Sequence, residues 1–132
     1  MTRFAIDAAT AIRLAEDNRP LPSKHSLVAP AVLKSQTLNV LFRDVRNEQR
    51  TERDALELVR RIVVMRIRLL SDRMLQRTAW KIATQLGQDE IGDAEYLAVT
   101  QLQADALVTS SVSLARTAEH LVPITPYESL HN

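Results

Sequence analysis

Two aspartates stand at positions where a carboxylate could do chemistry. Asp7 directly follows the apolar run Phe4–Ile6, which predicts a short buried strand, and Asp93 opens a helical pattern. An ionised carboxylate beside a buried strand is costly unless it is paired, solvated or bound to a metal. The alternatives are structural: Asp7 could cap the helix that starts at Ala8, and Asp93 could be an ordinary helix N-cap. Only a fold that brings distant parts of the chain together would join both in one site.

Several other kinds of chemistry are excluded by composition. The chain has no cysteine, which rules out disulfides, zinc thiolates and thiol nucleophiles. It has only two glycines, too few for a glycine-rich phosphate loop. His25, His120 and His131 are far apart with no metal-ligand spacing, so we expect surface or loop positions for them.

Short apolar runs alternate with longer helical patterns along the chain. The runs predict strands at 4–6, 26–28, 66–70, 106–109 and 121–124, although 66–70 could also extend the helix before it. Helices are expected at 8–15, 31–47, after Thr51, from Ser71 to a C-terminal Gly87, from Asp93, and at 112–119. Their expected buried faces include Leu56, Val59, Ile62 and Val63 in the third helix, and Met74, Leu75, Thr78, Ala79, Ile82, Ala83 and Leu86 in the fourth, with Trp80 in the core.

This alternation predicts an α/β fold in which helices cover both faces of a sheet. We expect a three-layer α/β/α sandwich with a mostly parallel sheet of four to five strands, formed by a single domain over residues 1–132. Ligands of such sheets bind beyond the carboxyl ends of the strands. Asp7, Ser110 and Ser111 follow strands and should lie at that edge, which Asp93 reaches only through an unusual connection. Asp105 precedes its strand and should lie at the opposite end.

The net charge of the chain is small, but its basic residues are concentrated in one segment. The net charge is +1, yet ten arginines fall between positions 43 and 77, interleaved with acidic residues. Solvated helix faces are the simpler interpretation. A surface for an acidic ligand is the alternative, because the guanidinium fork matches phosphate and carboxylate groups.

No segment approaches the length of apolar sequence that a membrane span requires. The N-terminal residues also lack the uninterrupted apolar region of a signal peptide. We therefore expect a soluble, cytoplasmic protein that does not insert into a membrane.

Five segments together resemble one known family, the PIN-domain nucleases. Phe4–Thr10 is similar to the family's opening "x-x-Asp-Ala-Ser", and Ile91–Thr100 resembles its central "Tyr-Asp-Ala-x-Tyr-x-Ala-x-Ala" helix. Ala104–Arg116 is similar to "Ala-x-Leu-Val-Thr-x-Asp-x-x-Leu-Ala". Val122–Ile124 and Tyr127–Leu130 follow in the manner of the family's C-terminal part. The resemblance spans nearly the whole chain and is strongest to the bacterial VapC toxins.

The resemblance implies a PIN-like domain with four acidic positions around Mg²⁺ or Mn²⁺. Asp7 and Asp93 match two of them, as catalytic and metal-binding residues. Gln36 stands where the family has a glutamate, and Ser111 where it has an aspartate. We expect Gln36 to point inward, either as a remnant of the site or satisfied by backbone. Asp89 and Glu90 are possible replacement ligands, and any metal should bind weakly.

Two functions follow from the resemblance and stay open at the level of sequence. The first is a metal-dependent endoribonuclease toxin with a degraded site and an RNA substrate. The second is a catalytically inactive PIN-fold binding module that keeps dimerisation and antitoxin binding. The family also implies a homodimer and a small VapB-like antitoxin as partner.

Overall fold

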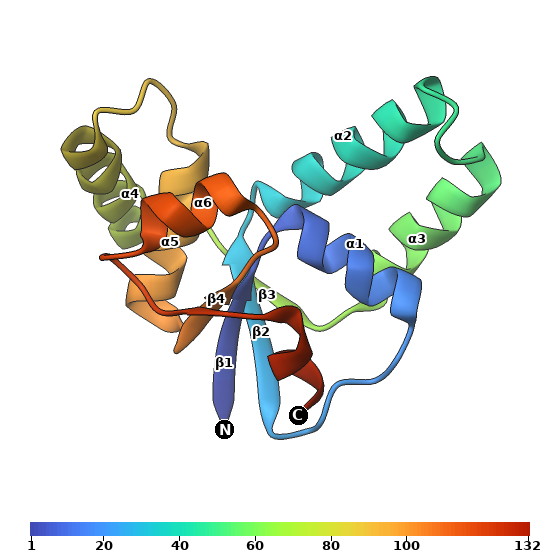
Figure 1. Ribbon diagram of the computed structural model, residues 1–132, viewed down its shortest axis with the longest axis horizontal. Coiled ribbons are helices and arrows are strands. Elements are labelled where there is room, and N and C mark those ends of the chain that lie inside the picture. The colour runs from blue at the N-terminus through green and yellow to red at the C-terminus, as the bar shows by residue number, and fades with distance from the viewer.

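The computed structural model describes residues 1–132 and contains one five-stranded sheet. Every strand pairs in parallel with its neighbours, in the order β3-β2-β1-β4-β5 (Figure 1). The strands are β1 (Thr2–Ile6), β2 (His25–Pro30), β3 (Ile67–Leu70), β4 (Ala106–Val108) and β5 (Ile124–Thr125). The expected α/β architecture is confirmed, and residues 67–70 form a strand rather than an extension of a helix.

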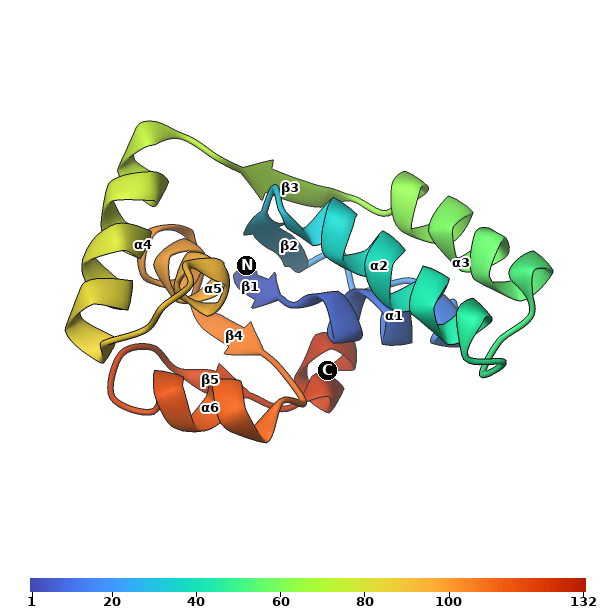
Figure 2. The same cartoon turned by 90° about the horizontal axis from the view of Figure 1, so that it is seen from above.

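Six α-helices and one 3₁₀-helix cover the sheet. They are α1 (Ala8–Asp17), α2 (Leu33–Arg46), α3 (Glu52–Val64), α4 (Arg73–Leu86), α5 (Gly92–Gln103), α6 (Val112–Ala118) and η1 (Tyr127–His131). Figure 2 shows α4 and α5 on one side of the sheet and α1, α2 and α3 on the other, which is the expected three-layer arrangement.

Helix boundaries follow local side-chain chemistry. Asp7, Thr51 and Asp72 each accept a hydrogen bond from the backbone N–H three residues on, and so start α1, α3 and α4. The expected cap at Ser71 is therefore wrong by one residue, because the carboxylate of Asp72 is the acceptor. Gly87 ends α4 in the left-handed conformation, with φ of 65°.

Two apolar clusters form the core. The larger joins the strands to α5 and to parts of α1, α4 and α6. The smaller fills the space where α1, α2 and α3 meet, and its buried residues are Ile12, Ala15, Leu41, Ala55 and Leu58. Helices α2 and α3 thus extend from the sheet as a pair packed on α1.

This arrangement corrects several expectations about burial. Leu56 and Val63 of α3 are exposed, because α3 packs only against its two helical neighbours through Ala55 and Leu58. Met74 and Leu86 of α4 are also exposed, whereas Leu75, Ala79, Ile82 and Ala83 form its buried face. Trp80 is not a core residue: it is 71% exposed, since the single neighbour of α4 covers its other side.

The connection between β3 and β4 contains two helices. Helices α4 and α5 pack side by side, joined by a short loop, and α5 runs back to the start of β4 (Figure 1). The first turn of α5 therefore lies near the carboxyl ends of the strands. Asp93 is not the N-cap of this helix; it lies inside the first turn, after the cap residue Ile91.

None of the helices combines the length and the apolar character needed to cross a bilayer.

Candidate functional site at the carboxyl edge of the sheet

Asp7 lies at the centre of the carboxyl edge, directly after β1. Its side chain is buried, with 8% of the residue exposed. Oδ1 accepts the backbone N–H of Thr10 at 2.9 Å, which makes Asp7 the N-cap of α1. Oδ2 accepts the hydroxyl of Thr109 at 2.6 Å. The structural alternative for Asp7, a cap of the helix that follows, is therefore present, and each carboxylate oxygen accepts a hydrogen bond.

Thr109 reaches Asp7 because their strands are neighbours. Ile6 pairs with Val108 in the parallel ladder, so the next residue of each strand emerges at the same level. The Thr109 hydroxyl also accepts the backbone N–H of Ser111 at 3.0 Å. Thr109 therefore connects the carboxylate on β1 to the loop after β4, and sequence analysis gave it no role.

Ser111 has a structural task at the family's fourth acidic position. Its hydroxyl accepts the N–H of Leu114 at 3.1 Å and caps α6. The residue is exposed and lies in the loop that Thr109 holds beside Asp7. Its side chain brings no charge to the edge.

Gln36 points inward from α2, as expected, but its partner is not backbone. The hydroxyl of Tyr96 on α5 donates a hydrogen bond to Oε1 of Gln36. Gln36 is half-buried and Tyr96 is almost fully buried. A contact between α2 and α5 thus crosses the carboxyl edge and occupies the amide oxygen that could otherwise bind a cation.

The electrostatics around Tyr96 show where the acidic residues gather. Burial is the main cause that raises the pKa of Tyr96, and the negative charges of Asp7, Glu95 and Asp93 raise it further. The hydroxyl of Tyr96 therefore stays protonated and acts as a donor. Burial also raises the pKa of Glu95, which sequence analysis did not select. Its position two residues after Asp93 on the same helix is the signal that was available.

These residues supply fewer charged ligands than the family's four acidic positions would, because Gln36 and Ser111 are uncharged. No three Asp, Glu or His side chains converge closely enough to hold a metal ion. Mg²⁺ in phosphoryl-transfer sites relies on one or two carboxylates together with waters and substrate phosphates. Here Asp7 is hydrogen-bonded through both oxygens, Gln36 is bound to Tyr96, and Asp93 is exposed.

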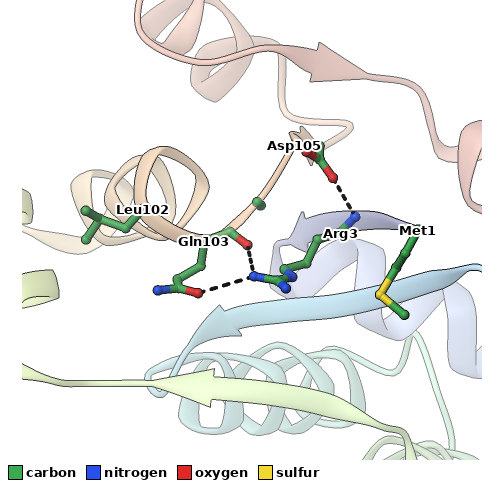
Figure 3. Close-up of a pocket in the computed structure, with 6 residues that line it drawn as sticks. Met1, Arg3, Leu102, Gln103 and Asp105 are labelled. Carbon is green, nitrogen blue, oxygen red and sulfur yellow. Dashed lines mark hydrogen bonds between the residues drawn. The ribbon is translucent and has the colours of Figure 1, made fainter.

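The opposite edge of the sheet has a different composition. As expected, Asp105 lies there: its carboxylate accepts the backbone N–H of Arg3 at 2.8 Å, next to a shallow pocket (Figure 3). The Arg3 side chain donates to the carbonyl oxygen and the side-chain oxygen of Gln103. These bonds fix β1 to the turn before β4, and Asp105 takes no part in the candidate site.

An apolar groove lies between α2, α3 and the edge strand β3. Eight of its ten lining residues are hydrophobic, and its volume is about 280 Å³. Leu38, Leu56 and Val63 on these helices are more than half exposed, and Phe42 is 69% exposed. A patch of exposed apolar side chains on adjoining helices is typical of a protein-binding surface.

Known proteins resemble this chain in structure but not detectably in sequence. No known family profile matches the sequence, and no curated protein is significantly similar to it. Among solved structures, PAE2754 from Pyrobaculum aerophilum is similar with a TM-score of 0.72 and 18% identity, over 98% of this chain and 93% of that one.

Two toxin–antitoxin structures are also similar. VapBC2 from Rickettsia felis, solved with a DNA fragment from its promoter, has a TM-score of 0.63 and 8% identity, over 94% of this chain and 98% of that one. VapBC-1 from nontypeable Haemophilus influenzae has a TM-score of 0.62 and 14% identity, over 95% and 98%. The chain therefore shares its fold with these three structures.

Proposed function

We propose that the chain is a VapC-like partner-binding module that does not hydrolyse RNA. The observation that carries this proposal is the state of the carboxyl edge. The two positions without the family's acids, Gln36 and Ser111, are engaged in hydrogen bonds that hold helices in place. Gln36 and Ser111 add no charge at this edge, so a divalent ion would meet fewer anionic oxygens than the family's four acids provide, and activation of a water would be weaker.

The expected partner is a small VapB-like antitoxin, alongside a second copy of the chain. The apolar groove between α2, α3 and β3 supports the first of these. A partner helix with apolar residues at helical spacing would cover Leu38 and Val63 and remove them from water. Burying each such side chain contributes roughly 1.5–3 kcal/mol before the cost of association.

An RNA cleavage assay tests the loss of activity. The chain is incubated with structured RNA and Mg²⁺ or Mn²⁺, beside an Asp7→Asn variant that keeps an oxygen for the α1 cap. We expect equal background cleavage by both proteins. Metal-dependent cleavage by the natural chain that disappears in Asp7→Asn contradicts the proposal and restores the nuclease interpretation.

Co-purification with the product of the small gene beside its own tests partner binding. Val63→Glu should abolish capture, because Val63 lines the groove and a charge in a buried apolar contact is strongly unfavourable. Val112→Glu is the matched control, since Val112 is 70% exposed but lies on α6. Equal capture by both variants, or no capture by the natural chain, argues against the groove as a binding surface.

A weakened ribonuclease is the second candidate. The negative charges of Asp7, Asp93 and Glu95 all raise the pKa of the Tyr96 hydroxyl. Three carboxylates near one hydroxyl favour this second candidate. Small rearrangements on binding RNA would then complete a site with Mg²⁺ or Mn²⁺. The assay with Asp7→Asn distinguishes this candidate from the first.

A further inference from the structure

A basic pocket opens at the amino edge of the sheet, on the far side from Asp7. It has a volume of about 780 Å³ and lies between the end of α1, the loop before β2 and the end of α3. Four arginines, Arg19, Arg60, Arg61 and Arg66, line it, and no carboxylate does. Since the whole chain is nearly neutral, this is a strong local excess of positive charge.

Not all of these charges are equally available. Arg60 and Arg61 are both bound to Glu57, at 2.6 and 3.3 Å. Arg61 also donates to the carbonyl oxygen of Ala15 at 2.9 Å, which offsets the negative end of α1. Arg19 and Arg66 are exposed and form no ion pair. These two guanidinium groups are free to bind an anion from outside the chain.

The inner part of the pocket is apolar. Leu14, Leu27 and Met65 contribute to its walls, together with the half-buried Leu21. His25 also lines it, and both of its ring nitrogens are shielded from water without a hydrogen-bond partner. The ring packs in an edge-to-face arrangement with Phe4, at a centroid distance of 5.0 Å.

We propose that this pocket binds a nucleoside phosphate. The phosphate would lie between Arg19 and Arg66, because the guanidinium fork matches its oxygens in number and geometry. The nucleoside would enter the apolar part, against the wall that Leu14, Leu27 and Met65 form. The volume of this pocket lies within the range of pockets that bind small organic ligands, roughly 300–1,000 Å³. A free nucleotide and the 5′-phosphate end of an RNA share this chemistry.

Isothermal titration of the full chain tests the proposal with AMP, adenosine and inorganic phosphate. We expect AMP to bind at least about tenfold more tightly than either fragment, since both parts of the pocket contribute. An Arg19→Gln/Arg66→Gln variant should lose at least about tenfold in AMP affinity. An Arg43→Gln/Arg77→Gln variant, with the same change in charge on α2 and α4, should bind AMP as the natural chain does.

Further arms identify the source of the ligand. A short RNA with a 5′-phosphate is compared with the same RNA carrying a 5′-hydroxyl. Preference for the phosphorylated RNA over AMP assigns the pocket to RNA ends, and the reverse assigns it to free nucleotides. The proposal is overturned if neither AMP nor the phosphorylated RNA binds. It is also overturned if the two double variants lose equal AMP affinity, or if AMP and inorganic phosphate bind equally well. None of these measurements depends on Asp7 or on the other residues of the carboxyl edge, so they test the pocket independently of the proposed function.

Discussion

At the scale of single residues, the side chains at two of the predicted acidic positions are uncharged and make hydrogen bonds that hold helices in place. Gln36 accepts from Tyr96, and Ser111 caps α6. Both tasks are also possible for a carboxylate, since Glu can accept from a tyrosine hydroxyl and Asp is a good N-cap. Gln36 and Ser111 therefore perform these structural roles without adding charge.

Restoring the two acids should restore metal binding. We expect the Gln36→Glu/Ser111→Asp variant to bind Mn²⁺ about tenfold or more tightly than the natural chain, because it adds anionic oxygen ligands at one edge. Isothermal titration with Mn²⁺ measures this. Gln36→Glu alone is the control and should give a smaller gain. If the double variant binds no better than the natural chain, these positions do not belong to a metal site.

Glu95 gives a dependence of stability on pH. Burial raises the pKa of Glu95 in the folded protein, so the folded state holds this proton more tightly than the unfolded state. The carboxylate therefore opposes folding once the pH rises above its folded pKa, and Glu95→Gln removes this effect. The variant should gain stability relative to the natural chain at pH 7 and much less at about pH 4. Urea unfolding at both pH values measures the difference, and a larger gain at the lower pH contradicts the assignment.

At the scale of elements, most boundaries could be predicted from sequence because their signals are local. Thr51 and Asp7 start helices, and Gly87 ends one, through bonds to residues within four positions. Burial faces of α3 and α4 could not be predicted in the same way. Periodicity shows that a helix has an apolar face, but not that its neighbour covers only part of it, which is why Leu56 and Trp80 are exposed.

Gly87 provides a test of such a local signal. Its φ of 65° favours glycine, and an added Cβ would meet no atom within 4 Å. Gly87→Ala should therefore destabilise the chain by about 1 kcal/mol through backbone strain alone. Gly87→Asn should cost less, because asparagine tolerates the left-handed region. Thermal or urea unfolding measures both, and equal losses would point to a cause other than φ.

The candidate site could be predicted only in part from the sequence. Strand ends predicted that Asp7 and Ser111 share one edge, since parallel strands end on the same side. The roles of Tyr96 and Thr109 depend on contacts between residues 60 and 102 positions apart, and single-sequence patterns do not contain such contacts. The resemblance implied that Gln36 and Ser111 stand at acidic positions, whereas their hydrogen bonds are visible only in the structure.

At the scale of the whole molecule, the two edges of the sheet differ in kind. The carboxyl edge is acidic and internally hydrogen-bonded, whereas the amino edge carries the arginine-lined pocket. The apolar groove lies beside the outermost strand β3, and Met65 is the one residue that lines both the groove and the amino-edge pocket. A partner protein bound in the groove would therefore leave most of the amino-edge pocket open. The fold therefore offers two candidate binding surfaces that lie apart from the carboxyl edge.

The order of the strands has a consequence for biosynthesis. β1 lies in the middle of the sheet, and its partner on one side is β4, with Phe4 opposite Ala106. A nascent polypeptide on the ribosome must hold β1 half-paired until some hundred further residues have been made. Until then the apolar face of β1 and its open hydrogen-bonding edge are exposed to other chains. Chaperone engagement during translation, rather than after release, is therefore expected for this topology.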